Sequence, residues 1–136
     1  MSGGSDSIRI LTVDDHPVFR SGIAALLATQ PDMSLVAEAS NGREALQQFR
    51  AHHPDITLMD LQMPDMNGLD AMIGIRNEFP EARIIVLTTY TEDVQVLRAM
   101  EAGARAYLIK ILLDKELLET IRAVHAGKKL LEIRKS

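Results

Sequence analysis

The chain of 136 residues contains no cysteine. This absence excludes disulfides, thiol catalysis and metal sites built on thiolate ligands. It suits a reducing compartment, so we expect a cytoplasmic protein. Long apolar runs are also missing: no run approaches the roughly 18 residues that a membrane span needs. An excess of positive charge is absent too: 15 lysines and arginines stand against 19 aspartates and glutamates, and the net charge of −4 argues against non-specific nucleic-acid binding by this chain alone.

The rest of the composition is that of an ordinary soluble domain, with 46% hydrophobic and 25% charged residues. A chain of this length fits one domain with a real core, which we assign to residues 8–127. Residues 1–7 are polar, do not resemble a signal peptide, and are expected to form a mobile leader. Residues 128–136 are expected to be a tail or linker, although their leucines are unusual for a polar linker.

Strand and helix patterns alternate along this domain. Apolar runs typical of buried strands occupy 8–13, 33–37, 56–59, 84–87 and 106–109. Helical patterns occupy 17–29, 42–52, 69–79, 92–102 and 114–126. Because crossovers between parallel strands are right-handed, this alternation predicts a parallel sheet with helices on both faces. The second run is the most polar and is expected at an edge of the sheet.

Local signals support the limits of the helices. Pro17 suits a first helical turn, where its missing N–H does no harm. Asn41 and Glu44 have the spacing of a capping box. Gly103 and Gly127 stand where helices should end.

Polar side chains suited to phosphoryl chemistry stand where the strands end. Asp14 and Asp15 follow the first run, Asp60 the third, Thr88 the fourth, and Lys110 the fifth. Open parallel sheets bind ligands at that edge, and clustered carboxylates repel one another unless a cation such as Mg²⁺ lies among them. Asp60 could then act as a nucleophile and form an aspartyl-phosphate. The metal, the lysine ammonium and the threonine hydroxyl would neutralise the oxygens of the transferred group.

Each of these residues also has an ordinary interpretation. An acidic pair after a strand is more often a turn or a helix cap, a lysine at a strand end often lies along the surface, and threonine favours strands. Their joint occurrence at successive strand ends favours the functional interpretation. His16, beside the acidic pair, is interpreted as a residue at the start of the first helix.

Four segments together carry a resemblance to a known family, namely 13–16, 60–70, 87–90 and 102–110. With them the chain resembles the receiver domains of two-component response regulators, and more narrowly those of the NarL/FixJ subfamily. The resemblance implies a flavodoxin-like (βα)5 fold. This is a three-layer α/β sandwich whose parallel sheet of five strands has the order 2-1-3-4-5.

By position, the resemblance implies that Asp60 accepts a phosphoryl group from a sensor histidine kinase. It also implies a Mg²⁺ site in which Asp15, Asp60 and the backbone carbonyl of Gln62 bind the ion, while Asp14 acts through water. Thr88 and Lys110 then resemble the pair of residues that senses the phosphoryl group.

The resemblance extends to the output of the switch. Tyr107 matches an aromatic residue that turns inward on activation, and Gln62 and Tyr90 stand at positions that tune dephosphorylation. The implied protein is a signalling switch that catalyses only its own phosphorylation and dephosphorylation. Through some part of the surface formed by the fourth helix, fifth strand and fifth helix, we expect either a phosphorylation-dependent homodimer or docking of an output domain. DNA binding would require an output domain that we expect to be absent here, and we expect no membrane partner.

One segment departs from the family pattern. After Lys110 the subfamily usually has an acidic residue, whereas this chain continues with Ile111, Leu112 and Leu113. Three consecutive apolar residues are expected to widen an exposed apolar patch beside the lysine.

Three other function classes fit less well. A Mg²⁺ phosphohydrolase resembling haloacid dehalogenases would need a second aspartate two residues after its nucleophile, where this chain has Gln62. A degenerate receiver that only binds partners would not need the complete set of acids, threonine and lysine. An FMN carrier would need a phosphate-binding loop after the first strand, where acids stand instead.

Overall fold

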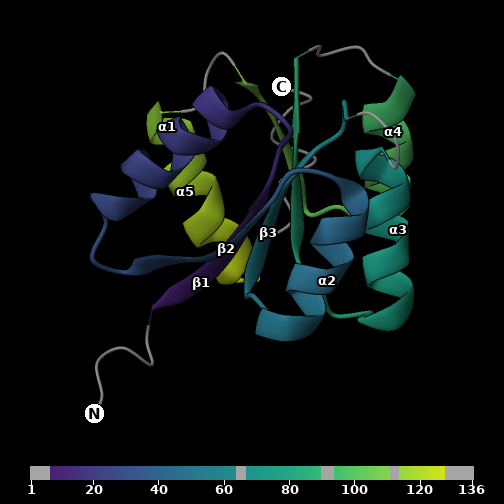
Figure 1. Ribbon diagram of the computed structural model, residues 1–136, viewed down its shortest axis with the longest axis horizontal. Helices are drawn as coiled ribbons and strands as arrows, with labels where there is room; N and C mark the ends of the chain where they lie inside the picture. Colours follow the sequence, from purple (N-terminus) through teal and green to yellow (C-terminus); the bar gives the residue numbers. More distant parts are fainter. Residues whose placement is uncertain (1–6, 64–66, 90–93, 111–113, 128–136) are drawn as a thin grey trace.

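The computed structural model describes residues 7–63, 67–89, 94–110 and 114–127. Within these ranges strands and helices alternate five times (Figure 1). The elements are β1 Ile8–Val13, α1 Pro17–Ala28, β2 Met33–Ala39, α2 Gly42–His52, β3 Ile56–Asp60, α3 Gly68–Glu78, β4 Ile84–Thr88, α4 Val94–Glu101, β5 Ala106–Ile109 and α5 Asp114–His125. The predicted alternation is confirmed, with most limits within two residues of the expected ones.

All neighbouring strands of the sheet are parallel, and their order is β2-β1-β3-β4-β5. The expected flavodoxin-like α/β fold is therefore confirmed, as is the edge position of β2. The strand order reverses between β1 and β3. In open parallel sheets, such a reversal leaves a crevice at the carboxyl ends of the two strands.

Helices cover both faces of the sheet, and each face has its own apolar core (Figure 1). On one face, Ile10 and Leu58 of the strands pack with Leu27 of α1 and Ile121 of α5. The other face packs against α2, α3 and α4 through the residues Leu11, Val13, Phe49, Met59, Met72, Ile75, Val96 and Ala99. None of the described helices combines the length and apolar character that a membrane crossing needs.

The expected helix signals act largely as predicted. Pro17 opens α1, and the Asn41 side chain accepts a 2.9 Å hydrogen bond from the Glu44 N–H. Glu44 reaches one residue further back than in a simple capping box, because its carboxylate accepts from the Ser40 N–H at 2.7 Å. Gly103 has a φ of 109°, a left-handed conformation that glycine adopts at little cost.

Helix α3 begins at Gly68, one residue before the expected start, with Asn67 as its cap. A Cβ atom on Gly68 would collide with the backbone carbonyl oxygen of Asp60 and with the Cα of Leu61. Glycine is therefore needed here because α3 starts directly against the strand end that carries Asp60.

Replacing Gly68 with alanine is expected to lower the free energy of unfolding by about 2–3 kcal/mol, since the backbone must shift to admit a methyl group. Gly22→Ala is the matched control: a Cβ there meets open space on α1. Alanine should raise stability at that position by up to about 1 kcal/mol, because it favours helix. Urea unfolding of the two variants measures both effects. Equal changes in the free energy of unfolding for Gly68→Ala and Gly22→Ala would contradict the packing described for α3.

Candidate functional site

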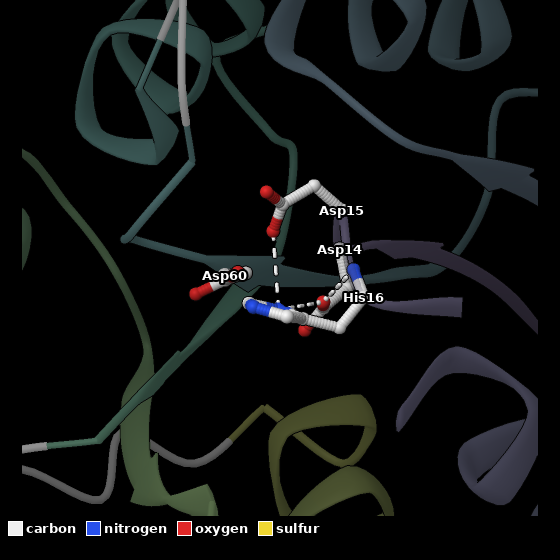
Figure 2. Close-up of side chains that lie close together, drawn as sticks. All are labelled: Asp14, Asp15, His16 and Asp60. Carbon is white, nitrogen blue, oxygen red and sulfur yellow. Dashed lines mark hydrogen bonds and ion pairs between the residues drawn. The ribbon is translucent and has the colours of Figure 1, made fainter. Parts of the chain in front are cut away.

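The strand ends bring together the acidic residues that the sequence singles out. Asp14 follows β1 and Asp60 is the last residue of β3. Ligand atoms of Asp14, Asp15, His16 and Asp60 all lie within 4.8 Å of one another (Figure 2). The predicted cluster of three carboxylates is therefore present at the crevice between β1 and β3.

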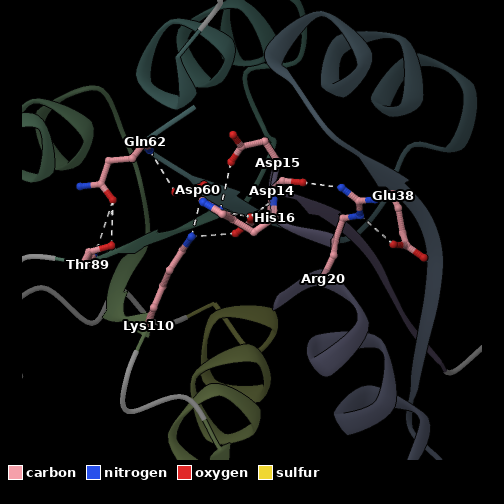
Figure 3. A network of polar contacts seen from close by, with 9 residues as sticks. All are labelled: Asp14, Asp15, His16, Arg20, Glu38, Asp60, Gln62, Thr89 and Lys110. Carbon is pink, nitrogen blue, oxygen red and sulfur yellow. Dashed lines mark hydrogen bonds and ion pairs between the residues drawn. The ribbon is translucent and has the colours of Figure 1, made fainter. Parts of the chain in front are cut away.

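Lys110 enters the same cluster from the end of β5 (Figure 3). Its ammonium nitrogen lies 2.8 Å from Asp14 Oδ2 and 3.2 Å from Asp60 Oδ2. Both carboxylates are fully buried, so the lysine supplies the positive charge that buried anions need. The ring of Phe19 on α1 lies beneath the ammonium, with 4.6 Å between nitrogen and ring centroid.

The surroundings of Asp60 oppose its ionisation. Burial is the largest cause and raises the pKa of Asp60, and the negative charge of Asp14 adds to the rise. The Gln62 N–H, which donates to Asp60 Oδ1 at 3.0 Å, and the charge of Lys110 both act to lower that pKa. Because the net shift is upward, the folded protein holds Asp60 in a state that favours a bound cation or a proton.

The raised pKa of Asp60 makes a prediction about stability. An acid whose pKa is higher in the folded than in the unfolded state stabilises folding at low pH, and this contribution is lost as pH rises through the folded pKa. Asparagine does not ionise, so Asp60→Asn should be more stable than the wild type at pH 7. The difference should shrink toward pH 4, near the unfolded pKa of about 3.9. Urea unfolding across this range measures it, and a difference that grew on acidification would contradict the electrostatic account.

His16 contacts the acids more closely than the sequence suggested. It occupies the N-cap position of α1, as expected, but its side chain makes no capping hydrogen bond. In addition, its ring Nδ1 lies 2.9 Å from Asp14 Oδ1 and 3.1 Å from Asp15 Oδ1 (Figure 2). The only signal in the sequence is adjacency to the acidic pair.

Gln62 links the ends of β3 and β4. Its side-chain nitrogen lies 3.4 Å from the Thr88 hydroxyl, and its side-chain oxygen accepts from the Thr89 hydroxyl at 3.1 Å (Figure 3). Thr88 is buried at the end of β4, beside the cluster as expected. The participation of Thr89 was not predicted, because its side chain is positioned by the path of the loop after β4.

A second unexpected contact braces the loop after β1. Arg20 of α1 donates to the backbone carbonyl of Asp14 at 2.6 Å and to Glu38 of β2 at 3.1 Å (Figure 3). The arginine therefore ties this loop to the edge strand. Its position in the first turn of α1 was the available signal.

Two further predicted residues lie away from the cluster or beyond the described structure. Tyr107 of β5 is half-buried and packs against the core under α4. It pairs with Val86, two residues before Thr88. Tyr90 and the apolar segment 111–113 lie outside the described residues.

Comparison with known proteins identifies the class to which this fold and site belong. Residues 10–122 match the family model described as the response regulator receiver domain. The chain therefore belongs to the response regulator receiver family. Its relatives place it within the NarL/FixJ subfamily, as the sequence predicted.

The relatives support this placement. The response regulator protein VraR of Staphylococcus aureus is 36% identical over 126 residues, covering 93% of this chain and 60% of VraR. A two-component response regulator of the LuxR family from Aurantimonas superposes with a TM-score of 0.86, at 38% identity over 90% of this chain and 88% of that one. A receiver domain from Mycobacterium tuberculosis, described as that of a NarL response regulator, has a TM-score of 0.85 and 29% identity, covering 90% and 99%. The chain thus spans about three fifths of the length of the curated relatives it matches.

Proposed function

We propose that this chain is a phosphorylation-activated switch in which Asp60 accepts a phosphoryl group from a sensor histidine kinase. The main support is the position of Asp60, buried at the end of β3 with Lys110 Nζ 3.2 Å from its Oδ2. A carboxylate oxygen of Asp60 attacks phosphorus and forms an O–P bond. The P–N bond to the kinase's phosphohistidine breaks, and the imidazole leaves with that electron pair.

The donor set of the cluster fits Mg²⁺. Asp14 Oδ2 and Asp60 Oδ2 are buried and receive no hydrogen bond from the described residues, although both meet the Lys110 ammonium. Hard carboxylate oxygens of this kind suit an ion that keeps several of its waters. Asp15, Asp60 and the Gln62 carbonyl would hold the ion directly, and Asp14 would act through water. When bound, Mg²⁺ supplies positive charge that offsets the charge on the phosphoryl oxygens.

Two residues at neighbouring strand ends sense the phosphoryl group in this proposal. Lys110 neutralises Asp14 and Asp60 before transfer and can afterwards move its charge to a phosphoryl oxygen. The Thr88 hydroxyl, which accepts from Gln62 Nε2 at 3.4 Å, donates its own proton to another phosphoryl oxygen. Tyr107 then turns inward as Thr88 moves.

The lifetime of the aspartyl-phosphate is the next part of the proposal. Gln62 and Tyr90 stand at the positions of the family pattern that tune dephosphorylation, and we assign them that role here. The protein thereby catalyses its own phosphorylation and dephosphorylation and acts on no separate substrate.

The output surface comprises α4, β5 and α5. On α4, Val94 and Leu97 are large apolar side chains exposed to solvent. Phosphorylation biases two packings of this surface, and a few kcal/mol of differential affinity is enough to favour a homodimer. The domain at 8–127 is proposed to control a DNA-binding output domain beyond this chain, in the cytoplasm. The curated relatives are longer than the chain and so have room for such a domain.

Removal of the metal tests the proposed chemistry. The wild-type chain incubated with acetyl phosphate and Mg²⁺ should gain about 80 Da, the mass of one phosphoryl group. A chelator in excess should reduce this labelling to background, because the carboxylates alone repel the incoming anion. Intact-mass spectrometry over time measures both reactions, with restored Mg²⁺ as the control. Labelling at an unchanged rate in the presence of chelator would contradict the proposal.

A further inference from the structure

The ring of His16 reaches the acid cluster from its solvent side. The turn after β1 folds back so that the His16 N–H donates to Asp14 Oδ1 at 2.7 Å. This turn also brings the ring nitrogen Nδ1 between two carboxylates, 2.9 Å from Asp14 Oδ1 and 3.1 Å from Asp15 Oδ1. His16 is the N-cap residue of α1, but its ring makes no hydrogen bond to the helix.

These spacings are those of ligands around one metal ion. In an octahedral site with ligands about 2.1 Å from the ion, adjacent ligand atoms lie about 3.0 Å apart and opposite ones about 4.2 Å apart. The two Nδ1–oxygen distances match the adjacent spacing. Ligand atoms of His16, Asp14, Asp15 and Asp60 all lie within 4.8 Å of one another, close to the opposite spacing.

A hydrogen bond alone accounts for only part of this arrangement. A proton on Nδ1 can point straight at one carboxylate oxygen, whereas the ring nitrogen faces two. Three ionised carboxylates beside one lysine ammonium also leave two negative charges, which one divalent cation neutralises. Two of the carboxylate oxygens, Asp14 Oδ2 and Asp60 Oδ2, are buried, and both face the Lys110 ammonium.

We propose that His16 is an additional protein ligand of the divalent-ion site. Imidazole suits cobalt, nickel, copper and zinc, whereas magnesium prefers oxygen ligands and water. The site therefore binds Co²⁺ and Ni²⁺ through His16 and the carboxylates, and binds Mg²⁺ through oxygens with water in the place of the ring. This inference rests on the metal-binding role proposed above for the carboxylates.

Metal titration of the full chain tests the inference. Isothermal titration calorimetry at pH 8 with Mg²⁺, Co²⁺ and Ni²⁺ compares the wild type with His16→Ala. We expect His16→Ala to weaken Co²⁺ and Ni²⁺ by about tenfold or more, the lower end of effects seen when partners of a metal site are removed. Mg²⁺ affinity should change by less than about twofold, since its ligands stay. His125→Ala, which removes an exposed imidazole at the end of α5, should change neither affinity.

A spectroscopic measurement separates ligation from an indirect effect. Electron–nuclear double resonance of high-spin Co²⁺ bound to protein labelled with ¹⁵N-histidine should show coupling to one nitrogen. The coupling should vanish in His16→Ala and persist in His125→Ala. Equal Co²⁺ and Mg²⁺ responses to His16→Ala without nitrogen coupling would overturn the inference while leaving the carboxylate site intact. A wild-type chain that bound none of these ions would overturn both.

Discussion

Replacing Asp60 with asparagine is expected to abolish phosphorylation. The asparagine keeps the shape of the buried side chain but lacks the carboxylate oxygen that attacks phosphorus. Incubation with acetyl phosphate and Mg²⁺ should therefore leave the intact mass unchanged, whereas the wild type gains about 80 Da. The expected loss is complete because no other carboxylate of the cluster stands at the end of β3, where Lys110 and the Gln62 N–H converge.

Asp70→Asn provides the matched control for this experiment. Asp70 is an exposed carboxylate in the first turn of α3, close in sequence to Asp60 but outside the cluster. This variant should be labelled like the wild type. Stoichiometric labelling of Asp60→Asn would show that another residue is the acceptor.

Loss of Lys110 is expected to lower the stability of the folded protein substantially. Lys110→Met would leave the buried carboxylates of Asp14 and Asp60 without their shared ammonium. Removing one partner of a buried ion pair typically costs about 3 kcal/mol or more. For a domain of this size that corresponds to a fall of roughly 10 °C in Tm. Mg²⁺ should raise the Tm of the variant more than that of the wild type, because the ion replaces the missing charge.

Lys115→Met separates this effect from the general loss of a lysine. Lys115 is largely exposed on α5 and meets Glu119 only at 3.9 Å, so its removal should cost at most about 0.5 kcal/mol. Thermal unfolding at pH 7 with and without Mg²⁺ measures both variants. Similar Tm values for the two methionine variants would mean that Lys110 does not hold the carboxylate pair together.

Much of the fold and the main acids of the site were predictable from the sequence. The alternation of apolar runs and helical patterns gives the parallel sheet, since right-handed crossovers leave few arrangements. Parallel strands end at one edge, so Asp14, Asp60, Thr88 and Lys110 had to lie near one another once the strands were placed. The strand order itself came from the family resemblance and is confirmed.

The unpredicted contacts are made by side chains whose direction depends on loops. The His16 ring faces the acids because the turn after β1 folds back through a hydrogen bond to Asp14. Gln62 reaches Thr89 across two loops that the sequence does not position relative to each other. Arg20 bridges Asp14 and Glu38 only because β1 and β2 are neighbours. Hydrophobic periodicity and the positions of strand ends predict where the backbone runs. These contacts also depend on side-chain rotamers and on the geometry of the turns, which the sequence pattern does not predict.

The start of α3 illustrates the same limit. The helical pattern pointed to a start at residue 69, but Asn67 caps the helix and Gly68 is its first residue. The reason is steric: Gly68 packs directly against the Asp60 carbonyl, where a side chain would not fit. Hydrophobic periodicity does not predict such a close approach of two backbone segments.

The most direct test of the central claim is to locate the phosphoryl group on the wild-type chain. The protein is incubated with acetyl phosphate and Mg²⁺ and digested at acidic pH to preserve the acyl phosphate, and its peptides are sequenced by mass spectrometry. We expect a single modified peptide, with about 80 Da added at Asp60. A modification placed at Asp14, Asp15 or any other residue, or no modification at all under these conditions, would contradict it.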